Sequence, residues 1–172
     1  MDTTISSNSI ANLLQHSRSA WVTRARPKID RIACPWLIRR FIDPNAEFLY
    51  VPAAQVLDVA KAEQAIPYDV PDVQFAHRGE LCSFDAFIAD FAIDDPALAQ
   101  LALIVRGADT GKLELTPQSA GLLAISRGLS INYADDHAML EHGMVVYDAL
   151  YAWICSARAE VRNADLLAKK TT

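Results

Sequence analysis

The residues with the clearest capacity for chemistry are an imidazole and a carboxylate near the C-terminal end of the chain. His137 and Glu141 are four positions apart, so a helix places their side chains on one face. That spacing lets two side chains chelate one metal ion, as the two histidines of the zinc motif HExxH do. The neighbouring His142 points about 100° away from Glu141 and is not expected to join them. His137 and Glu141 are therefore candidate metal ligands.

The helix expected around these two residues carries a narrow polar stripe on a mostly apolar cylinder. Asp148, Tyr151 and Cys155 continue the face of the candidate ligands, and most of the remaining circumference is aliphatic or aromatic. Surface helices usually show the opposite pattern. Buried carboxylates need partners, so the stripe predicts contact with a metal ion or with cations of the chain. Asp148 and Tyr151 are expected to support the ligand end through hydrogen bonds or ion pairs.

Two loop segments elsewhere in the chain offer further ligand atoms. His77 lies in an expected turn shortly before Cys82 and Asp85, and Asp109 lies in a glycine-containing break after an expected helix. Mixed imidazole and carboxylate ligands suit a transition metal ion, with iron or manganese favoured and zinc also suitable. The first hypothesis is a mononuclear site whose ligands are His77, Asp109, His137 and Glu141. Asp85 is expected to support them, and an open coordination position allows redox chemistry.

Cationic side chains in residues 24–40 suggest a second hypothesis, a non-enzymatic oxyanion sensor. Guanidinium groups beside a helix N-terminus can bind an oxyanion. Cys34 precedes an expected helix start and lies near Arg31, and both features lower a thiol pKa, so Cys34 is a candidate reactive or catalytic thiol. The alternative, which residue type favours, is that Cys34 is a small buried hydrophobe of the core. The candidate oxyanion ligands are Arg31, Arg39, Arg40 and Arg106.

A third hypothesis gives the same charges a purely structural role. Arg31 or Arg40 would neutralise Asp148 and Glu141 in a buried network, and such networks shift pKa values without any function. No GxSxG elbow, dinucleotide loop or kinase signature is present to support another class of enzyme. The residues alone leave all three hypotheses open.

Composition indicates a globular protein with small-molecule or inorganic partners. The chain has 172 residues, of which 52% are hydrophobic and 22% charged, which suffices for one domain with a full core. A net charge of -5 argues against nucleic acid as a main partner. No apolar run approaches the length of a membrane span, and the N-terminus lacks a signal core, so we expect a cytoplasmic protein. Three widely spaced cysteines predict free thiols. A homo-oligomer is compatible with these features.

The periodicity of apolar residues and the turn signals predict a helix-dominated α+β fold, with a small sheet packed by several helices and a long C-terminal helix. Extended segments are expected at 20–23, 46–51 and 66–76. Helices are expected at 35–42, 53–65, 83–90, 96–106 and 116–128, and from 135 or 136 onward. Pro35 is expected at the first position of its helix, unless an earlier turn begins at Asp30. Residues 1–19 are expected to be a flexible lead with a short helix at 10–16, residues 20–160 one domain, and residues 161–172 a frayed tail.

Several motifs together resemble a known family, the C-terminal domain of chromate-resistance protein B, which also occurs alone. The resemblance spans about residues 20–155 and rests on Trp21–Arg24, Lys28–Asp43, Ala46–Phe48, His77 with Cys82–Asp85, Ile104–Thr110 and Asp136–Tyr151. It implies a role in the response of a bacterium to chromate, metal or oxidative stress.

Within that response, the resemblance leaves two expectations. One is a metal-dependent oxidoreductase that removes superoxide formed during chromate reduction. The other is a module in which the arginines hold chromate or sulfate and Cys34 responds to oxidation. Longer members carry an additional basic N-terminal portion and resemble regulators. Residues 1–19 leave no room for such a portion, so no DNA-binding role is expected.

Overall fold

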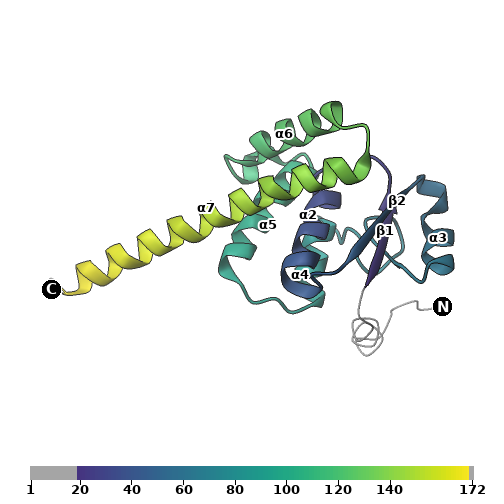
Figure 1. Cartoon of the computed structure of the whole chain (residues 1–172). Helices are drawn as coiled ribbons and strands as arrows, with labels where there is room; N and C mark the ends of the chain where they lie inside the picture. Colours follow the sequence, from purple (N-terminus) through teal and green to yellow (C-terminus); the bar gives the residue numbers. More distant parts are fainter. Residues whose placement is uncertain (1–18, 171–172) are drawn as a thin grey trace.

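A small parallel sheet lies toward one end of the molecule, and helices build the remainder (Figure 1). The computed structural model describes residues 19–170, with side chains described through residue 164. The lead expected at 1–19, apart from Ser19, and the helix expected at 10–16 lie outside the described residues. The helix-dominated α+β class is confirmed. The strands are β1 (Ala20–Arg24), β2 (Glu47–Val51) and β3 (Ile66–Pro67), in the order β2-β1-β3.

Parallel pairing requires a crossover connection between strands, and helices supply it here. The connection from β1 to β2 is α2 (Asp30–Leu37) with the π-helical turn η1 (Ile38–Ile42). The connection from β2 to β3 is the short turn η2 (Ala53–Gln55) with α3 (Val56–Ala62). The later elements are α4 (Ser83–Asp90), α5 (Pro96–Asp109), η3 (Leu113–Leu115), α6 (Ser119–Asn132) and α7 (Asp136–Lys170).

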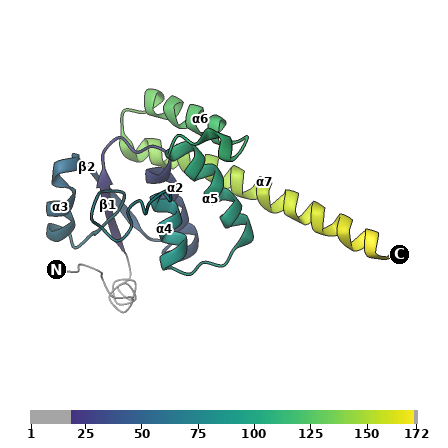
Figure 2. The same cartoon turned by 180° about the vertical axis from the view of Figure 1, so that it is seen from behind.

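Both faces of the sheet are covered, although unequally (Figure 2). Adjacent residues of a strand point to opposite faces. Val22 of β1 joins a small cluster with Val56 and Ala60 of α3. Trp21 faces the main core, which is built from α2, α4, α5, α6 and α7. Strand β1 is therefore packed on both faces, and this packing fixes the position of its carboxyl end.

Helix α2 begins at Asp30, so the earlier turn that we considered is present, and Pro35 lies inside the helix and not at its first position. A proline inside a helix leaves the carbonyl four residues before it without an N–H partner. Here that carbonyl belongs to Arg31, and it accepts hydrogen bonds from the hydroxyls of Tyr50 (3.3 Å) and Tyr68 (3.4 Å). Two tyrosines thus replace the missing bond, and the helix can include Pro35 and still start at Asp30.

Helix α5 continues through Gly107, where we expected it to break. A Cβ atom on Gly107 would lie 2.3 Å from the Oγ of Ser119, so the glycine lets α6 approach α5 closely. The helix therefore carries Asp109 at its last position instead of leaving it in a loop.

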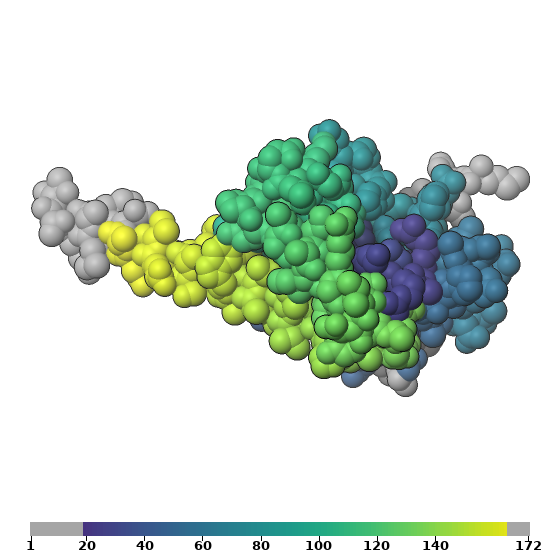
Figure 3. Space-filling model, turned by 90° about the horizontal axis from the view of Figure 1, so that it is seen from above, coloured from purple at the N-terminus to yellow at the C-terminus, as the bar shows by residue number. Residues whose placement is uncertain are grey.

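Helix α7 is more exposed than the apolar residues around its polar stripe suggested. Its buried positions in the body include Leu140, Gly143, Tyr147 and Ile154. The predicted polar stripe faces outward, since the side chains of Glu141 and Asp148 are 63% and 55% exposed. Beyond Ile154 the helix projects from the body (Figure 3) and runs to Lys170, where we expected a frayed tail over 161–172.

Gly143 lies where α7 approaches α2 closely, which makes it a test of this packing. A Cβ at position 143 would lie 2.7 Å from Cγ2 of Ile32. We expect Gly143→Ala to lower the free energy of unfolding by about 1–3 kcal/mol, because a methyl group is forced into a packed core. Urea denaturation measures this.

The matched control is Gly128→Ala on α6, where an added Cβ meets nothing within 4 Å. This change is expected to be neutral or to stabilise by about 0.4–1 kcal/mol, because alanine restricts the unfolded chain. Equal effects of the two substitutions would contradict the close approach of α7 to α2.

Candidate metal centre

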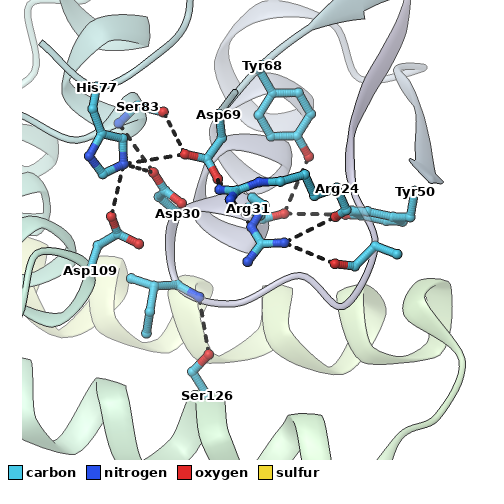
Figure 4. A network of polar contacts seen from close by, with 12 residues as sticks. Arg24, Asp30, Arg31, Tyr50, Tyr68, Asp69, His77, Ser83, Asp109 and Ser126 are labelled. Carbon is cyan, nitrogen blue, oxygen red and sulfur yellow. Dashed lines mark hydrogen bonds and ion pairs between the residues drawn. The ribbon is translucent and has the colours of Figure 1, made fainter. Parts of the chain in front are cut away.

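A cluster of acidic side chains lies at the carboxyl edge of the sheet. Helix α2 follows β1 and begins with Asp30, while Asp69 stands two residues after the end of β3. Because β1 and β3 are parallel neighbours, the residues that follow them meet at one edge. Asp109, at the end of α5, and His77, from the segment before α4, complete the cluster (Figure 4).

The centre of this cluster is the Nε2 atom of His77. It lies 3.2 Å from Oδ2 of Asp30, 3.3 Å from Oδ1 of Asp69 and 3.1 Å from Oδ2 of Asp109. One ring nitrogen carries at most one proton, so it cannot make three good hydrogen bonds at once. Three carboxylate oxygens therefore surround one nitrogen, and its single N–H can donate a good hydrogen bond to only one of them.

The three carboxylates are buried to different extents and have different second partners. Asp30, 2% exposed, accepts a hydrogen bond from the backbone N–H of Ser83 at the start of α4 (3.2 Å). Asp69, 5% exposed, accepts from the Ser83 hydroxyl (3.1 Å) through one oxygen. Its other oxygen accepts from two arginines of the β1–α2 region, Arg24 (2.7 Å) and Arg31 (3.2 Å). These partners hold the carboxylates of Asp30 and Asp69 in place in the metal-free protein.

The proximity of these groups shifts their proton affinities. The hydrogen bond with Asp30, aided by the charges of Asp109 and Asp69, raises the pKa of His77 to about 9. Burial, followed by repulsion from Asp30 and Asp69, raises the pKa of Asp109 to about 8. Burial and the charge of Asp30 also raise the pKa of Asp69. Near neutral pH the cluster therefore retains protons that exposed groups of the same type would release.

A thiol borders the same cluster. Ligand atoms of Cys82, Asp30 and Asp109 all lie within 4.8 Å of one another, as do those of Asp30, Asp69 and His77. Cys82 is fully buried, and its Sγ donates to Asp85 at 3.4 Å. Burial raises the pKa of this thiol far above its ordinary value, so without a metal ion Cys82 is a neutral neighbour of the site.

Comparison with known proteins identifies the family of this chain. A family model described as "ChrB, C-terminal domain" matches residues 21–154. The chain belongs to the ChrB C-terminal domain family. This confirms the resemblance inferred from the motifs.

One curated relative of this domain is Protein ChrB of Cupriavidus metallidurans (strain ATCC 43123 / DSM 2839 / NBRC 102507 / CH34). It is 34% identical over 146 residues, which cover 84% of this chain but 43% of the relative. The chain therefore matches less than half of that protein's length. No solved structure is significantly similar to the chain. No helix in residues 19–170 combines the length and the apolar character needed to cross a bilayer.

The ChrB-type domain does not bring the four predicted metal ligands together. His77 and Asp109 meet, but His137 lies edge-on against Tyr50, with ring centroids 5.5 Å apart. Glu141 pairs with Arg39 at 2.9 Å on the outer surface of α7. The side chains that lie beside His77 and Asp109 are instead those of Asp30 and Asp69.

The three residues predicted to support the ligands also have other partners. Asp85 is bound by Arg106 through two hydrogen bonds of 2.6 and 3.0 Å. Asp148 accepts from the Trp36 indole (2.8 Å) and from Arg40 (3.0 Å), and Tyr151 donates to Asp95 (2.6 Å). Of the three, Asp85 lies nearest to the cluster, because it also accepts from the backbone N–H of Cys82.

The four arginines proposed as oxyanion ligands are likewise engaged with carboxylates. Arg31 pairs with Asp69, Arg39 with Glu141, Arg40 with Asp148 and Arg106 with Asp85. The four guanidinium groups thus serve four different acids. Cys34 is fully buried, and burial followed by repulsion from Asp30 raises its pKa, which is opposite to the activation expected from its position before a helix.

Asp30 and Asp69 were missed because each was hidden by its sequence surroundings. Asp30 is the single acid of a basic segment, and Asp69 stands in a segment interrupted by prolines. The signal that would have found them is the position of each residue just after a strand. Parallel strands bring such residues together, but parallel pairing was not part of the prediction.

The raised pKa values predict how the stability of the metal-free domain depends on pH. The folded state holds protons on His77 and Asp109 that the unfolded state releases, so raising the pH favours unfolding. The contribution of His77 is complete below pH 6.5 and is lost as pH rises through about 9, and Asp109 acts in the same direction between 3.8 and about 8. We expect the melting temperature in EDTA to fall between pH 6.5 and 9.

The same titration on two histidine variants locates the effect. His77→Gln should make the fall shallower, whereas His142→Gln should leave it unchanged, because His142 stacks on Tyr133. A melting temperature that rises over this pH range would show that the cluster does not hold these protons.

The burial of the thiols predicts their reactivity. Cys155 is exposed, whereas Cys34 and Cys82 are buried. We expect one thiol per chain to react rapidly with 5,5′-dithiobis(2-nitrobenzoate) in the folded protein and all three after denaturation. Cys155→Ser should abolish the rapid phase. Rapid reaction of Cys34 in that variant would contradict its burial and would support the prediction that it is a reactive thiol.

Proposed function

We propose that this domain binds a transition metal ion through His77, Asp30, Asp69 and Asp109, and that metal binding is its contribution to bacterial chromate resistance. The observation that carries the proposal is the convergence of three carboxylate oxygens on one imidazole nitrogen at 3.1–3.3 Å. The link to chromate resistance rests on membership of the ChrB C-terminal domain family.

The distances between these atoms fit a coordination sphere. Metal–nitrogen and metal–oxygen bonds of about 2.0–2.2 Å separate neighbouring ligand atoms by roughly 2.8–3.1 Å in octahedral geometry and roughly 3.3–3.6 Å in tetrahedral geometry, a range of about 2.8–3.6 Å. The three distances from His77 Nε2 fall within this range. Side-chain movements would then have to admit an ion between His77 and the three carboxylates, of which Asp30 and Asp69 already have ligand atoms within 4.8 Å of each other and of His77.

The charge of the cluster also favours a cation. Arg24 and Arg31 contact Asp69 through its Oδ2 atom and do not pair with Asp30 or Asp109. The positive charge nearest to Asp30 and Asp109 is therefore that of protonated His77, which they share. Uncompensated buried carboxylates are costly. A divalent ion would replace that proton and compensate more of the negative charge, so affinity is expected to increase as pH rises.

The ligand types narrow the choice of metal. Three carboxylates and one imidazole are mostly hard donors, which suit manganese or iron and, less selectively, zinc. The side chain of His77 is 43% exposed, so the site has one side open to solvent. A small molecule or water could bind the ion from that side.

Redox turnover is the finer part of this proposal. A bound manganese or iron ion that alternates between two oxidation states would oxidise one superoxide to dioxygen. It would then reduce a second superoxide, with two protons, to hydrogen peroxide. No other reductant is required. Superoxide dismutase activity of the manganese- or iron-loaded protein, compared with His77→Ala, tests this part separately from binding.

The oxyanion-sensor hypothesis has less support. Each of its four arginines is held by a different carboxylate, and its thiol is buried. An oxyanion would have to displace those carboxylates before it could bind. Titration with chromate and sulfate by calorimetry is the direct test of this hypothesis, and we expect no binding heat.

Removal of one ligand should remove metal affinity. We expect His77→Ala to weaken manganese binding by at least about 100-fold, because even residues that only hydrogen-bond a ligand contribute roughly 10- to 100-fold. Isothermal titration calorimetry with Mn²⁺ and Zn²⁺ measures this, and elemental analysis of protein purified without added metal identifies the natural ion.

The matched control is His137→Ala, which removes an imidazole that lies against Tyr50 outside the cluster. Its affinity should equal that of the wild-type protein. Absence of binding heat for Mn²⁺, Fe²⁺ and Zn²⁺ in the wild-type protein would overturn the proposed function. A loss confined to His137→Ala would place the ligands at the start of α7.

A further inference from the structure

The loop that presents Asp30 has an unusual backbone conformation. Ile29, immediately before Asp30, has φ 42° and ψ −103°. A β-branched residue rarely adopts positive φ, because its side chain crowds the backbone. Ile29 is 4% exposed, so neither water nor a flexible surface accommodates this conformation. Such strained residues persist only where surrounding contacts enforce them, and they concentrate at functional sites.

Two helices that contribute no ligand to the proposed site enforce the conformation of Ile29. Its N–H donates to the Oγ of Ser126 on α6 at 3.1 Å. Its carbonyl accepts from the hydroxyl of Tyr147 on α7 at 2.7 Å. Both side chains are buried, at 3% and 2% exposure. The polar groups of one strained residue are thus held from two sides.

The same two helices hold the loop at a second point. Arg26, which also has positive φ, donates its backbone N–H to Asp136 at 3.0 Å. Its guanidinium donates to the carbonyl of Ser130 in the last turn of α6 (2.5 Å) and to that of Ala134 in the connection between α6 and α7 (2.7 Å). The loop before α2 is therefore shaped by the α6–α7 hairpin over several residues, not by Ile29 alone.

The Ile29 carbonyl also begins α2. It accepts hydrogen bonds from the N–H groups of Ile32 (3.1 Å) and Ala33 (2.9 Å), which belong to the first turn of that helix. Asp30 is the first residue of the same turn, and its carboxylate reaches Nε2 of His77. A rotation of the Ile29 peptide would therefore turn the start of α2 and displace the Asp30 carboxylate.

We propose that Ser126 and Tyr147 are positioning residues of the metal centre, which hold the Ile29 backbone so that the Asp30 carboxylate stays directed at His77. This inference rests on the proposed function for its consequence, metal affinity, but its structural part concerns the metal-free protein. Neither residue touches the ion. Each acts through the backbone before Asp30.

The test compares two tyrosine hydroxyls on one helix. Tyr147→Phe removes the hydrogen bond to Ile29 and keeps the buried ring. Tyr151→Phe removes a hydrogen bond of 2.6 Å to Asp95 and does not touch the loop. We expect Mn²⁺ affinity to fall by about 10- to 100-fold in Tyr147→Phe, as for residues that orient a metal ligand, and to stay unchanged in Tyr151→Phe. Ser126→Ala should act in the same direction as Tyr147→Phe.

A double-mutant cycle separates positioning from general destabilisation. If Tyr147 acts through Asp30, the affinity loss caused by Tyr147→Phe should disappear in an Asp30→Asn background. It should persist in an Asp109→Asn background, because Asp109 is held at the end of α5. If Tyr147→Phe lowers the Mn²⁺ affinity by the same factor in the Asp30→Asn and the Asp109→Asn background, Tyr147 supports the core in general. That result would overturn the inference.

A crystal structure of metal-free Tyr147→Phe tests the structural part without any metal. We expect Ile29 to relax to negative φ and the Asp30 carboxylate to move away from His77. An unchanged Ile29 and Asp30 would overturn the inference. If the wild-type protein binds no metal, the proposed function fails, and this crystal structure still decides whether Tyr147 positions Asp30.

Discussion

The structure depends on the burial of three carboxylates beside a single imidazole. Asp30 and Asp69 are nearly inaccessible, and each needs donors that water would otherwise supply. The start of α4 supplies some of them through Ser83, and the arginines at the end of β1 and the start of α2 supply others. One oxygen each of Asp30, Asp69 and Asp109 is directed at Nε2 of His77, which can donate only one proton. The surrounding elements thus leave one place where a positive charge is still favourable.

The elements that create this place are those that a small parallel sheet requires. Strand β1 must connect to β2 through a helix, and that helix starts at the carboxyl edge where β3 also ends. Pro35 would interrupt this helix, but Tyr50 and Tyr68 bond the carbonyl that it leaves free. Figure 4 shows Tyr68 next to Asp69 of the acidic cluster, whereas Tyr50 lies farther from the cluster, on the side of Arg24 and Arg31.

Helix α7 contributes to the site through its buried side and not through its polar stripe. The pairs Arg39–Glu141 and Arg40–Asp148 join it to η1 at the surface, where such pairs contribute little to stability. Gly143 allows contact with Ile32, and Tyr147 bonds the residue before Asp30. The helix that was expected to carry ligands instead contacts the loop before Asp30, which is one of the proposed ligands.

Local sequence patterns determined the α+β class, the family and the approximate positions of most helices and strands, although β3 spans only Ile66–Pro67 of the extended segment expected at 66–76 and α7 continues through the expected frayed tail. They also selected His77 and Asp109 as candidate ligands of one site. They did not determine Asp30 and Asp69, or the side of α7 that is buried. Helical periodicity shows which residues share a face, but not which face meets another element. His77 lies 47 residues from Asp30 in sequence. Only the parallel pairing of β1 with β3, and the packing of α7 on α2, bring the ligand atoms within reach, because those contacts join segments that no local pattern connects.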